Sequence, residues 1–282
     1  MKFLKVIPVV VLILALMACS FTVNVPTVRT GVTQTLEIKE PVIADAQVNK
    51  ISIEMGAGSL KLSGGATDLI EGTVRYNVAP WKPTITRQTD GITLTQKNTS
   101  NVGVPDGNIT NEWNLKLGSS PIDLSLSAGA YEGDMDFSGL AITNLAISDG
   151  ASKASLRFDS PNPVEMQHLS YKTGASNVEL LGLGNANVHE ITFDGGVGSY
   201  TLDFSGDMKN NVNVRVNSGM SDLTIIIPTT ARALITITGG LSNINASGTW
   251  TISGSTYEYG SAGPMITINI DMAVGNLQLK QQ

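Results

Sequence analysis

Short runs of alternating apolar and polar residues recur along the chain, and each run is interrupted by a cluster of small residues, as in GAGSLKL, DGASKAS and TGASNVEL. Taking the middle residue of each small-X-small cluster as a corner gives spacings of 71, 23, 24, 22, 23, 21 and 33 residues. Five consecutive intervals of 21 to 24 predict a structural repeat. The corners fall at Ala57, Ala128, Ala151, Ala175, Val197, Met220, Leu241 and Val274.

The residues on both sides of each corner alternate with a period of two. Six and four residues before the corner both positions are apolar in every repeat, from Ile51 and Ile53 to Ile268 and Ile270, and the residue between them is mostly polar. The same alternation follows three and five residues after most corners. Each repeat is therefore predicted to form two short strands with one buried face, joined where small residues let the backbone bend sharply.

Identical registers without any helical pattern predict that each repeat stacks in parallel on the next. The predicted fold class is all-β, a single-stranded parallel β-helix (β-solenoid) with rungs of about 21–24 residues. Leucine-rich repeats share the period but not the sequence pattern, and an outer-membrane barrel would need aromatic girdles. About ten rungs spaced by ~4.8 Å would make a rod on the order of 50 Å long.

The N-terminal part of this rod is predicted to be irregular, over residues 46–120, and the repeats regular over 121–282. Asp90-Gly91 is predicted to form a hairpin turn, and residues 98–110 an exposed polar loop. Rung strands are expected at Val74/Tyr76, Ile92/Leu94 and Leu115/Leu117.

The first nineteen residues, MKFLKVIPVVVLILALMAC, carry a different signal. Two lysines precede an apolar stretch that is too short to cross a membrane, which is typical of a signal peptide over residues 1–18. The stretch Leu16-Met17-Ala18-Cys19 resembles a bacterial lipobox, and this resemblance implies lipid attachment at Cys19 and cleavage before it. Residues 19–45 are predicted to hold the lipidated Cys19, an irregular tether interrupted by prolines, and a first strand near Leu36 to Lys39. The expected location is the extracytoplasmic face of a bacterial cell membrane or outer membrane. A plain secretory signal with an incidental cysteine is the alternative.

Composition and charge narrow the functional classes. Cys19 is the single cysteine and there are two histidines, so neither a disulfide framework nor a usual metal site is expected, and no cofactor is predicted. The net charge of −6 disfavours a nucleic-acid partner. The Gly195-Gly196-Val197-Gly198 stretch approaches a calcium-binding repeat, but Tyr200 stands where that repeat needs Asp.

One acidic row is a candidate for chemistry. Glu132, Asp134 and Asp136 alternate with apolar residues, so all three are predicted to face outward, with Arg157 at the position of Asp134 on the next rung. Two suitably spaced carboxylates can act as acid and base on a polysaccharide. The alternative is an ordinary charge pair on a solvated strand face, which we favour because a catalytic site also needs a cleft and aromatic sugar platforms. His168 and His189 lack a ligand-spaced partner and are expected on the surface.

The segments GAGSLKLSGGA and LSLSAGAYEGDMDFSGLAITNLAISDGASKASLRFDSPNP resemble the toast-rack proteins, which are related to the putative adhesin domains and to the C-terminal domain of cell-wall-antibiotic response proteins. The resemblance covers roughly residues 36–282 and implies a β-solenoid without established catalytic residues. The sequence thus favours a non-catalytic, lipid-anchored envelope protein acting in adhesion, scaffolding or envelope-stress interaction, with an envelope protein or glycan as partner. The alternatives are a polysaccharide-active enzyme and a self-assembling element that stacks through Leu277 to Leu279.

Overall fold

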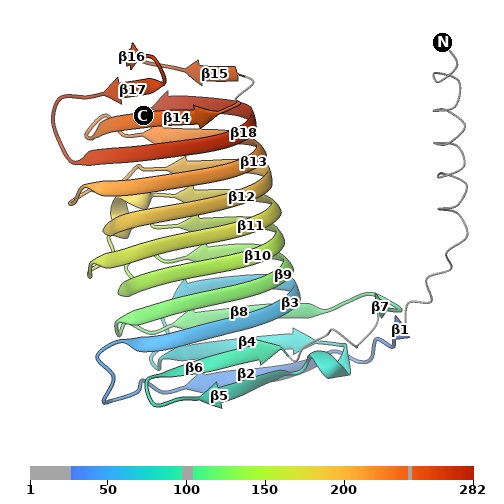
Figure 1. The fold of residues 1–282 in the computed structure, drawn as a ribbon. Helices are drawn as coiled ribbons and strands as arrows, with labels where there is room; N and C mark the ends of the chain where they lie inside the picture. The colour runs from blue at the N-terminus through green and yellow to red at the C-terminus, as the bar shows by residue number, and fades with distance from the viewer. Residues whose placement is uncertain (1–26, 97–103, 241–242) are drawn as a thin grey trace, which may run out of the picture.

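The computed structural model describes residues 27–96, 104–240 and 243–282, which are all-β and built on one 16-stranded sheet (Figure 1). Its centre is a stack of long strands that each bend near the middle, so that every strand has a first and a second arm. These strands pair in parallel with the next one along the chain. They are β9 (Ile122–Asp136), β10 (Ile142–Arg157), β11 (Met166–Leu181), β12 (Val188–Asp203) and β13 (Val212–Ile227).

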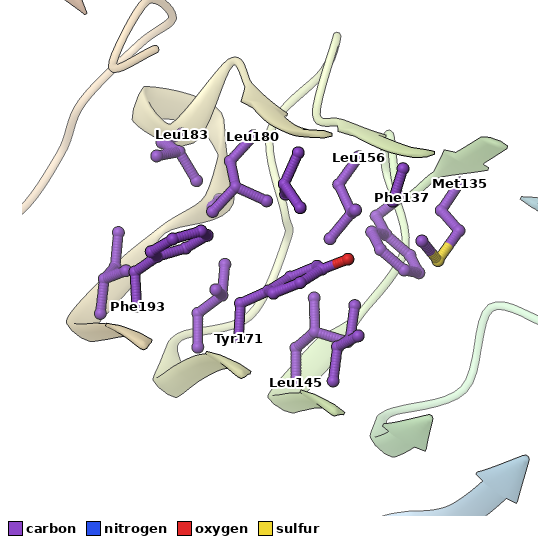
Figure 2. Close-up of a cluster of buried hydrophobic side chains, with 14 of the residues drawn as sticks. Met135, Phe137, Leu145, Leu156, Tyr171, Leu180, Leu183 and Phe193 are labelled. Atoms are coloured by element: carbon purple, nitrogen blue, oxygen red, sulfur yellow. The ribbon is translucent and has the colours of Figure 1, made fainter. Parts of the chain in front are cut away.

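The core lies between the two arms. Alternate residues of each arm point inward, and because the strands are in register, equivalent residues form apolar columns along the stack. Tyr171 and Phe193 from the first arms stack at 5.7 Å between ring centroids, facing Leu156 and Leu180 from the second arms (Figure 2). The alternation seen in the sequence is therefore the division between core and surface.

Short return segments connect the end of each second arm to the next rung and hydrogen-bond to one another. The Phe158 amide donates to the Leu181 carbonyl at 3.0 Å, and the Asn162 amide donates to the Asn185 carbonyl at 2.8 Å. Asn162 is 1% exposed and its side chain donates to the carbonyls of Ile142 and Ala186. These bonds satisfy backbone groups that would otherwise be buried without partners.

The corners are narrow because glycine occupies the same position in successive rungs. A Cβ built on Gly174 would lie 2.4 Å from the Gly150 carbonyl oxygen, and one on Gly196 would lie 2.3 Å from that of Gly174. A larger residue would push neighbouring rungs apart, so the repeated glycine is required by close backbone approach.

The N-terminal end of the sheet changes from parallel to antiparallel pairing beyond β6 (Gly91–Gln96) and β8 (Asn111–Leu117). Strand β3 (Asn49–Gly64) is the first long bent strand, and two shorter strands share its outer edge, with β6 on its first arm and β8 on its second. Antiparallel strands then complete this end, namely β4 (Ile70–Tyr76), β2 (Gln34–Glu40) and β5 (Pro83–Arg87). The remaining small elements near this end are β1 (Thr27–Val28), β7 (Val104–Pro105) and the 3-10 turn η3 (Ala79–Trp81).

At the C-terminal end the chain does not stack in sequence order. Strand β18 (Met265–Gln281) lies between β13 and the rung formed by β14 (Arg232–Gly239) and β15 (Asn243–Ala246). The antiparallel hairpin of β16 (Thr251–Ser253) and β17 (Thr256–Tyr259) covers the free edge of β14. A second 3-10 turn, η4 (Leu183–Ala186), lies in a return segment of the centre.

These observations correct the sequence-based architecture in three places. The sheet is mixed and open, so parallel stacking describes its centre but not the whole sheet. The corner of β9 is at Ala130, which pairs with Ala57 and Ala151, and not at Ala128. The repeats over 121–282 are interrupted by the β16–β17 hairpin and by the out-of-order β18.

Other predictions can be compared directly. The β5–β6 pairing confirms the hairpin turn at Asp90-Gly91, whereas Val74 and Tyr76 lie on an antiparallel strand. The expected corner at Leu241 lies outside the described residues. In the part of the chain that the structure describes, no helix has the length and apolar character needed to cross a membrane.

Candidate functional site

The outer face of the second arms is hollowed into a groove of about 500 Å³ over β3, β9, β10, β11 and β12. Side chains two and four residues after each corner line it, because strand alternation turns these positions outward. Hydroxyl and amide groups alternate there with charges, and none of the lining residues is aromatic. The lining includes Ser59, Ser155, Asn177, Ser199 and Thr201 besides the charged residues.

The groove carries both signs of charge. Lys61 lies opposite Asp134, and Glu132 lies opposite Lys153, on directly paired rungs. In the described part of the chain, no ion pair within 4.0 Å involves Lys61, Lys153, Glu132 or Glu179. These four groups are therefore free to interact with a ligand.

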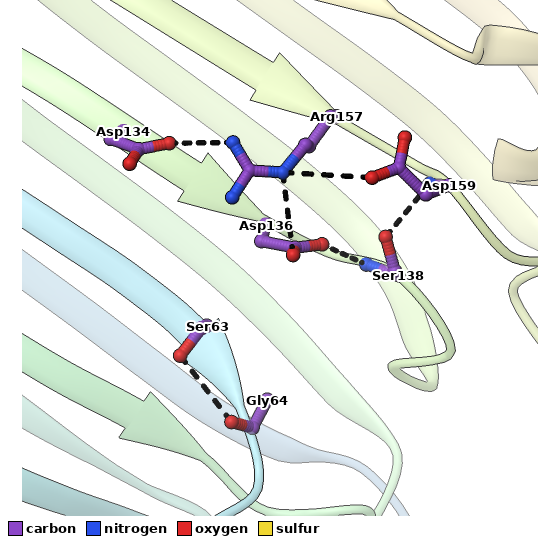
Figure 3. Close-up of polar contacts among 7 residues, drawn as sticks. All are labelled: Ser63, Gly64, Asp134, Asp136, Ser138, Arg157 and Asp159. Atoms are coloured by element: carbon purple, nitrogen blue, oxygen red, sulfur yellow. Dashed lines mark hydrogen bonds and ion pairs between the residues drawn. The ribbon is translucent and has the colours of Figure 1, made fainter.

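Arg157 forms a separate charged cluster beside the groove (Figure 3). Its Nη1 donates to Asp134 Oδ1 at 2.7 Å, and its Nε lies 3.3 Å from Asp136 Oδ2 and 3.7 Å from Asp159 Oδ2. Arg157 pairs directly with Asp136, so the sequence-based placement opposite Asp134 was two residues out. Two members of the acidic row, Asp134 and Asp136, contact Arg157, whereas Glu132 lies opposite Lys153.

The electrostatics of this cluster match a structural ion-pair network. The hydrogen bond to Asp134 raises the pKa of the Arg157 guanidinium. Burial alone would raise the pKa of Asp136, but hydrogen bonds from Ser138 and the charge of Arg157 outweigh it and hold that pKa below its usual value. A general acid at neutral pH needs a raised carboxyl pKa, so the arrangement gives the enzyme alternative no support.

A buried polar cluster at the corners of β10 and β11 was not anticipated from the sequence. The Tyr171 hydroxyl donates to Asp149 Oδ2 at 2.7 Å, the Ser176 hydroxyl donates to Asp149 Oδ1 at 3.3 Å, and Thr173 also hydrogen-bonds that carboxylate. Asp149 is 9% exposed. The Tyr171 hydroxyl and the hydrogen-bonded Thr173–Ser176 pair thus satisfy the buried Asp149 side chain, where an unpaired polar group would be costly.

The tyrosines near this carboxylate are held neutral. Burial raises the pKa of Tyr171, and the neighbouring Tyr131 and Asp149 raise it further. Burial likewise raises the pKa of Tyr131 and of Tyr200. The Tyr200 hydroxyl is buried and has no hydrogen-bond partner in the described structure. A signal for the cluster existed in the sequence, since Asp149 and Thr173 stand two residues before their corners, at an inward position.

The remaining candidates are placed as follows. His168 Nδ1 lies 3.2 Å from Glu190, and His189 Nε2 lies 3.4 Å from Glu165. All four residues are exposed or partly exposed, at the starts of β11 and β12 or, for Glu165, directly before β11. Within residues 27–96, 104–240 and 243–282, no three His, Cys, Asp or Glu side chains gather as metal ligands would. Cys19 lies outside the described residues.

The sequence matches a protein family, and the fold is similar to solved structures. A family model described as the N-terminal domain of toast_rack, DUF2154, matches residues 25–167 and 161–226. Among solved structures, the chain is similar to a putative cell adhesion protein from Clostridium sporogenes, with 24% identity, a TM-score of 0.49 and coverage of 89% of this chain and 99% of that one.

A putative adhesin from Parabacteroides merdae is similar at 12% identity, with a TM-score of 0.41 and coverage of 89% and 98% of the two chains. A putative lipid binding protein from Parabacteroides distasonis is similar at 10% identity, with a TM-score of 0.39 and coverage of 89% and 99%. No curated protein matches the sequence. Likenesses at this level do not transfer a ligand or a partner to this chain.

Proposed function

We propose, from the premise that the chain belongs to the toast-rack family, that it is a non-catalytic, lipid-anchored protein of the bacterial cell envelope that acts in adhesion or scaffolding. The second-arm groove is its binding surface, on a β-solenoid-like stack that holds the surface rigid. The observation that carries the proposal is a set of four charged side chains along one strand face that form no ion pair within the described residues, namely Lys61, Lys153, Glu132 and Glu179.

The groove fits a protein partner better than a sugar chain. Sugar rings are usually bound against aromatic side chains, and none of the lining residues is aromatic. Lysines and carboxylates alternate over neighbouring rungs, so a surface with both signs of charge in the complementary order would satisfy them. The paired strands hold the backbone beneath these side chains in one conformation, so binding need not order the backbone. The partner is therefore an envelope protein with a polar, mixed-charge surface.

Lipid attachment at Cys19 supports the same proposal from the sequence. The lipobox-like stretch Leu16–Cys19 contains the only thiol of the chain, directly after the apolar leader. More than one acyl chain on that residue would hold the protein on a membrane stably. The stack would then stand on the extracytoplasmic face, where neither disulfides nor metals are needed for its stability because the core is large and apolar.

The groove is tested by charge reversal in the full-length, membrane-anchored protein. Lys153→Glu places a third negative charge between Glu132 and Glu179, and the expected result is at least a tenfold loss of the polypeptide that crosslinks to the wild type in its own envelope. Lys172→Glu is the matched control, since Lys172 is exposed on the first arm of β11 and the net charge changes equally. Equal capture by the two variants and the wild type would overturn the groove as the binding surface. Capture of a glycan in place of a polypeptide would overturn the class of partner.

The anchor has its own test. Cys19→Ser should release the protein from the membrane fraction and abolish labelling by a radioactive fatty acid, while the folded strands remain intact. A Cys19→Ser protein that stays in the membrane fraction would contradict lipid anchoring without affecting the groove.

A further inference from the structure

The C-terminal end of the stack exposes apolar side chains on two strands that carry no charged residue, β15 and β16, and the exposed Glu258 of β17 lies beside β16. From Ala233 to Tyr257 the sequence contains no charged residue. Ile252 on β16 is 57% exposed and Ile244 on β15 is 36% exposed. We name this surface the C-terminal tip and define it as β15, β16 and their side chains.

The C-terminal tip also exposes strand edges. Strand β15 pairs with β18 on one side, and no strand of the described residues pairs with its other side. Strand β16 is likewise the last strand of its path, after β17. Asn243, Ile244 and Asn245 are exposed on β15. An unpaired, uncharged edge is a template for adding a strand from another chain.

The opposite end of the sheet is protected in ways that the tip is not. Its last strand, β2, carries exposed Glu37 and Lys39, and the edge strand β5 begins at Pro83. Charges and proline on an edge prevent pairing with another chain. Among the edge strands that the structure describes at the two ends, β15 and β16 are therefore the ones without charge or proline.

We propose that the C-terminal tip binds the C-terminal tip of a second copy of this chain, through antiparallel pairing of the two β15 edges about a two-fold axis. Charge selects this occupant. With a net charge of −6, two copies that approach side by side repel each other, whereas contact through β15 brings together two strands without charge and leaves Glu258 at the border of the contact, beside β16. The exposed Ile244 and Ile252 of both copies would be covered in the same contact.

The geometry limits the assembly to a dimer. Each copy has one C-terminal tip, and a two-fold contact uses the same patch on both copies, so no free patch remains for a third. The tip lies at the far end of the stack from β2, near which the chain enters the fold (Figure 1). This contact does not depend on the proposed groove or on the lipid anchor, and it can hold when either of them fails.

The test is sedimentation velocity of the full-length protein in detergent over roughly 1–100 µM, the range of weak interfaces. The expected result is a rise in mass from one copy towards two. Asn243→Lys and Ile252→Lys should each abolish that rise. Burying the charged lysine in the contact would cost free energy, and the lysines of the two copies would repel each other across the two-fold axis. Each substitution brings the net charge closer to zero, so a loss of pairing cannot come from greater overall repulsion.

Asn213→Lys is the matched control, since Asn213 is an exposed asparagine on the first arm of β13, paired on both sides and outside both the groove and the C-terminal tip. It should dimerise like the wild type. A Cys19→Ser protein should also dimerise, which separates tip pairing from association through lipid. A monomer at every concentration would overturn the proposal, and so would a dimer that survives both tip substitutions or is lost equally in Asn213→Lys.

Discussion

The centre of the stack and its two ends differ in how their strands pair. In the centre, each rung meets a copy of its own pattern on both sides, so register, inward columns and corner glycines repeat from β9 to β13. At the ends there is no further rung, and the chain turns antiparallel in β2, β4 and β5 or in β16 and β17. Repetition stabilises the middle of a stack but cannot terminate it.

The two ends also differ from each other. The N-terminal end replaces a continuous rung by β6 and β8, and the side chains of Gln96 and Asn111 fill the gap at the corner, where Gln96 accepts from the Gly56 amide at 3.0 Å. At the C-terminal end, β18 lies between β13 and the rung formed by β14 and β15, and the uncharged edge strands β15 and β16 are left exposed. One end is closed by polar side chains and charge, and the other remains open to association.

The largest expected effect tests how strongly the centre is packed. Leu180→Ala removes a fully buried side chain of β11 and should lower the free energy of unfolding by about 2–5 kcal/mol, because it leaves a cavity between the arms. Ile244→Ala at the C-terminal tip should cost less than about 1 kcal/mol, since that side chain is 36% exposed. Urea unfolding of both variants measures the difference, and equal losses would contradict the distinction between centre and tip.

The next effect tests the corner glycines. Gly174→Ala should destabilise by about 1–3 kcal/mol, because its Cβ would meet the Gly150 carbonyl at 2.4 Å. Gly56→Ala occupies the same position in β3, yet its nearest contacts are side-chain atoms of Gln96 at 3.6 Å. It should be neutral or stabilising, and thermal unfolding compares the two directly. A neutral Gly174→Ala would show that neighbouring rungs can separate without cost.

The buried carboxylate of the centre gives a third comparison. Tyr171→Phe removes one of the donors to Asp149 and should cost about 1–2 kcal/mol, since the carboxylate keeps its other hydroxyl partners. Tyr200→Phe removes a hydroxyl that has no partner in the described structure, so stability should not fall. Chemical denaturation at neutral pH measures both, and a larger loss in Tyr200→Phe would contradict the hydrogen-bond assignment.

Stability should also depend on alkaline pH. The raised pKa values of Tyr131 and Tyr171 keep both neutral in the folded state, whereas tyrosines of the unfolded chain ionise near pH 10. Above about pH 10 the unfolded state therefore binds fewer protons than the native state, and the free energy of unfolding should fall by up to about 1.4 kcal/mol per pH unit for each tyrosine. Below pH 10 these groups contribute no pH dependence. Tyr171→Phe should reduce the slope measured in urea titrations from pH 9 to 12, and an unchanged slope would exclude Tyr171 as its source.

The smallest effect is expected at the charged cluster outside the core. Arg157→Gln breaks contacts to Asp134 and Asp136, but all three side chains are partly exposed, so the change in stability should be within about 1 kcal/mol. The difference from wild type should shrink further in 0.5 M salt, because exposed ion pairs are screened. A loss comparable to that of Leu180→Ala would mean that the cluster contributes to the stack as the core does.

Local alternation was enough to predict the strands, their buried faces and the small-residue corners, because burial on one face of a strand imposes a period of two. It also predicted the Asp90-Gly91 hairpin and the outward acidic row with Arg157 nearby. It could not fix the register. A shift of two residues keeps every side chain on its own face, so alternation alone does not separate a corner at Ala128 from the true one at Ala130.

Tertiary structure alone decided the order of the strands and the sites between them. Since all rungs share one pattern, β18 fits beside β13 as well as a sequential neighbour would, and only contacts between distant segments place it there. The Asp149 cluster, the groove and the C-terminal tip each combine residues of different rungs. Nothing in the sequence near one of these residues indicates which residues of the other rungs it will meet. The sequence determined which side chains face the core, and long-range pairing determined which of them meet.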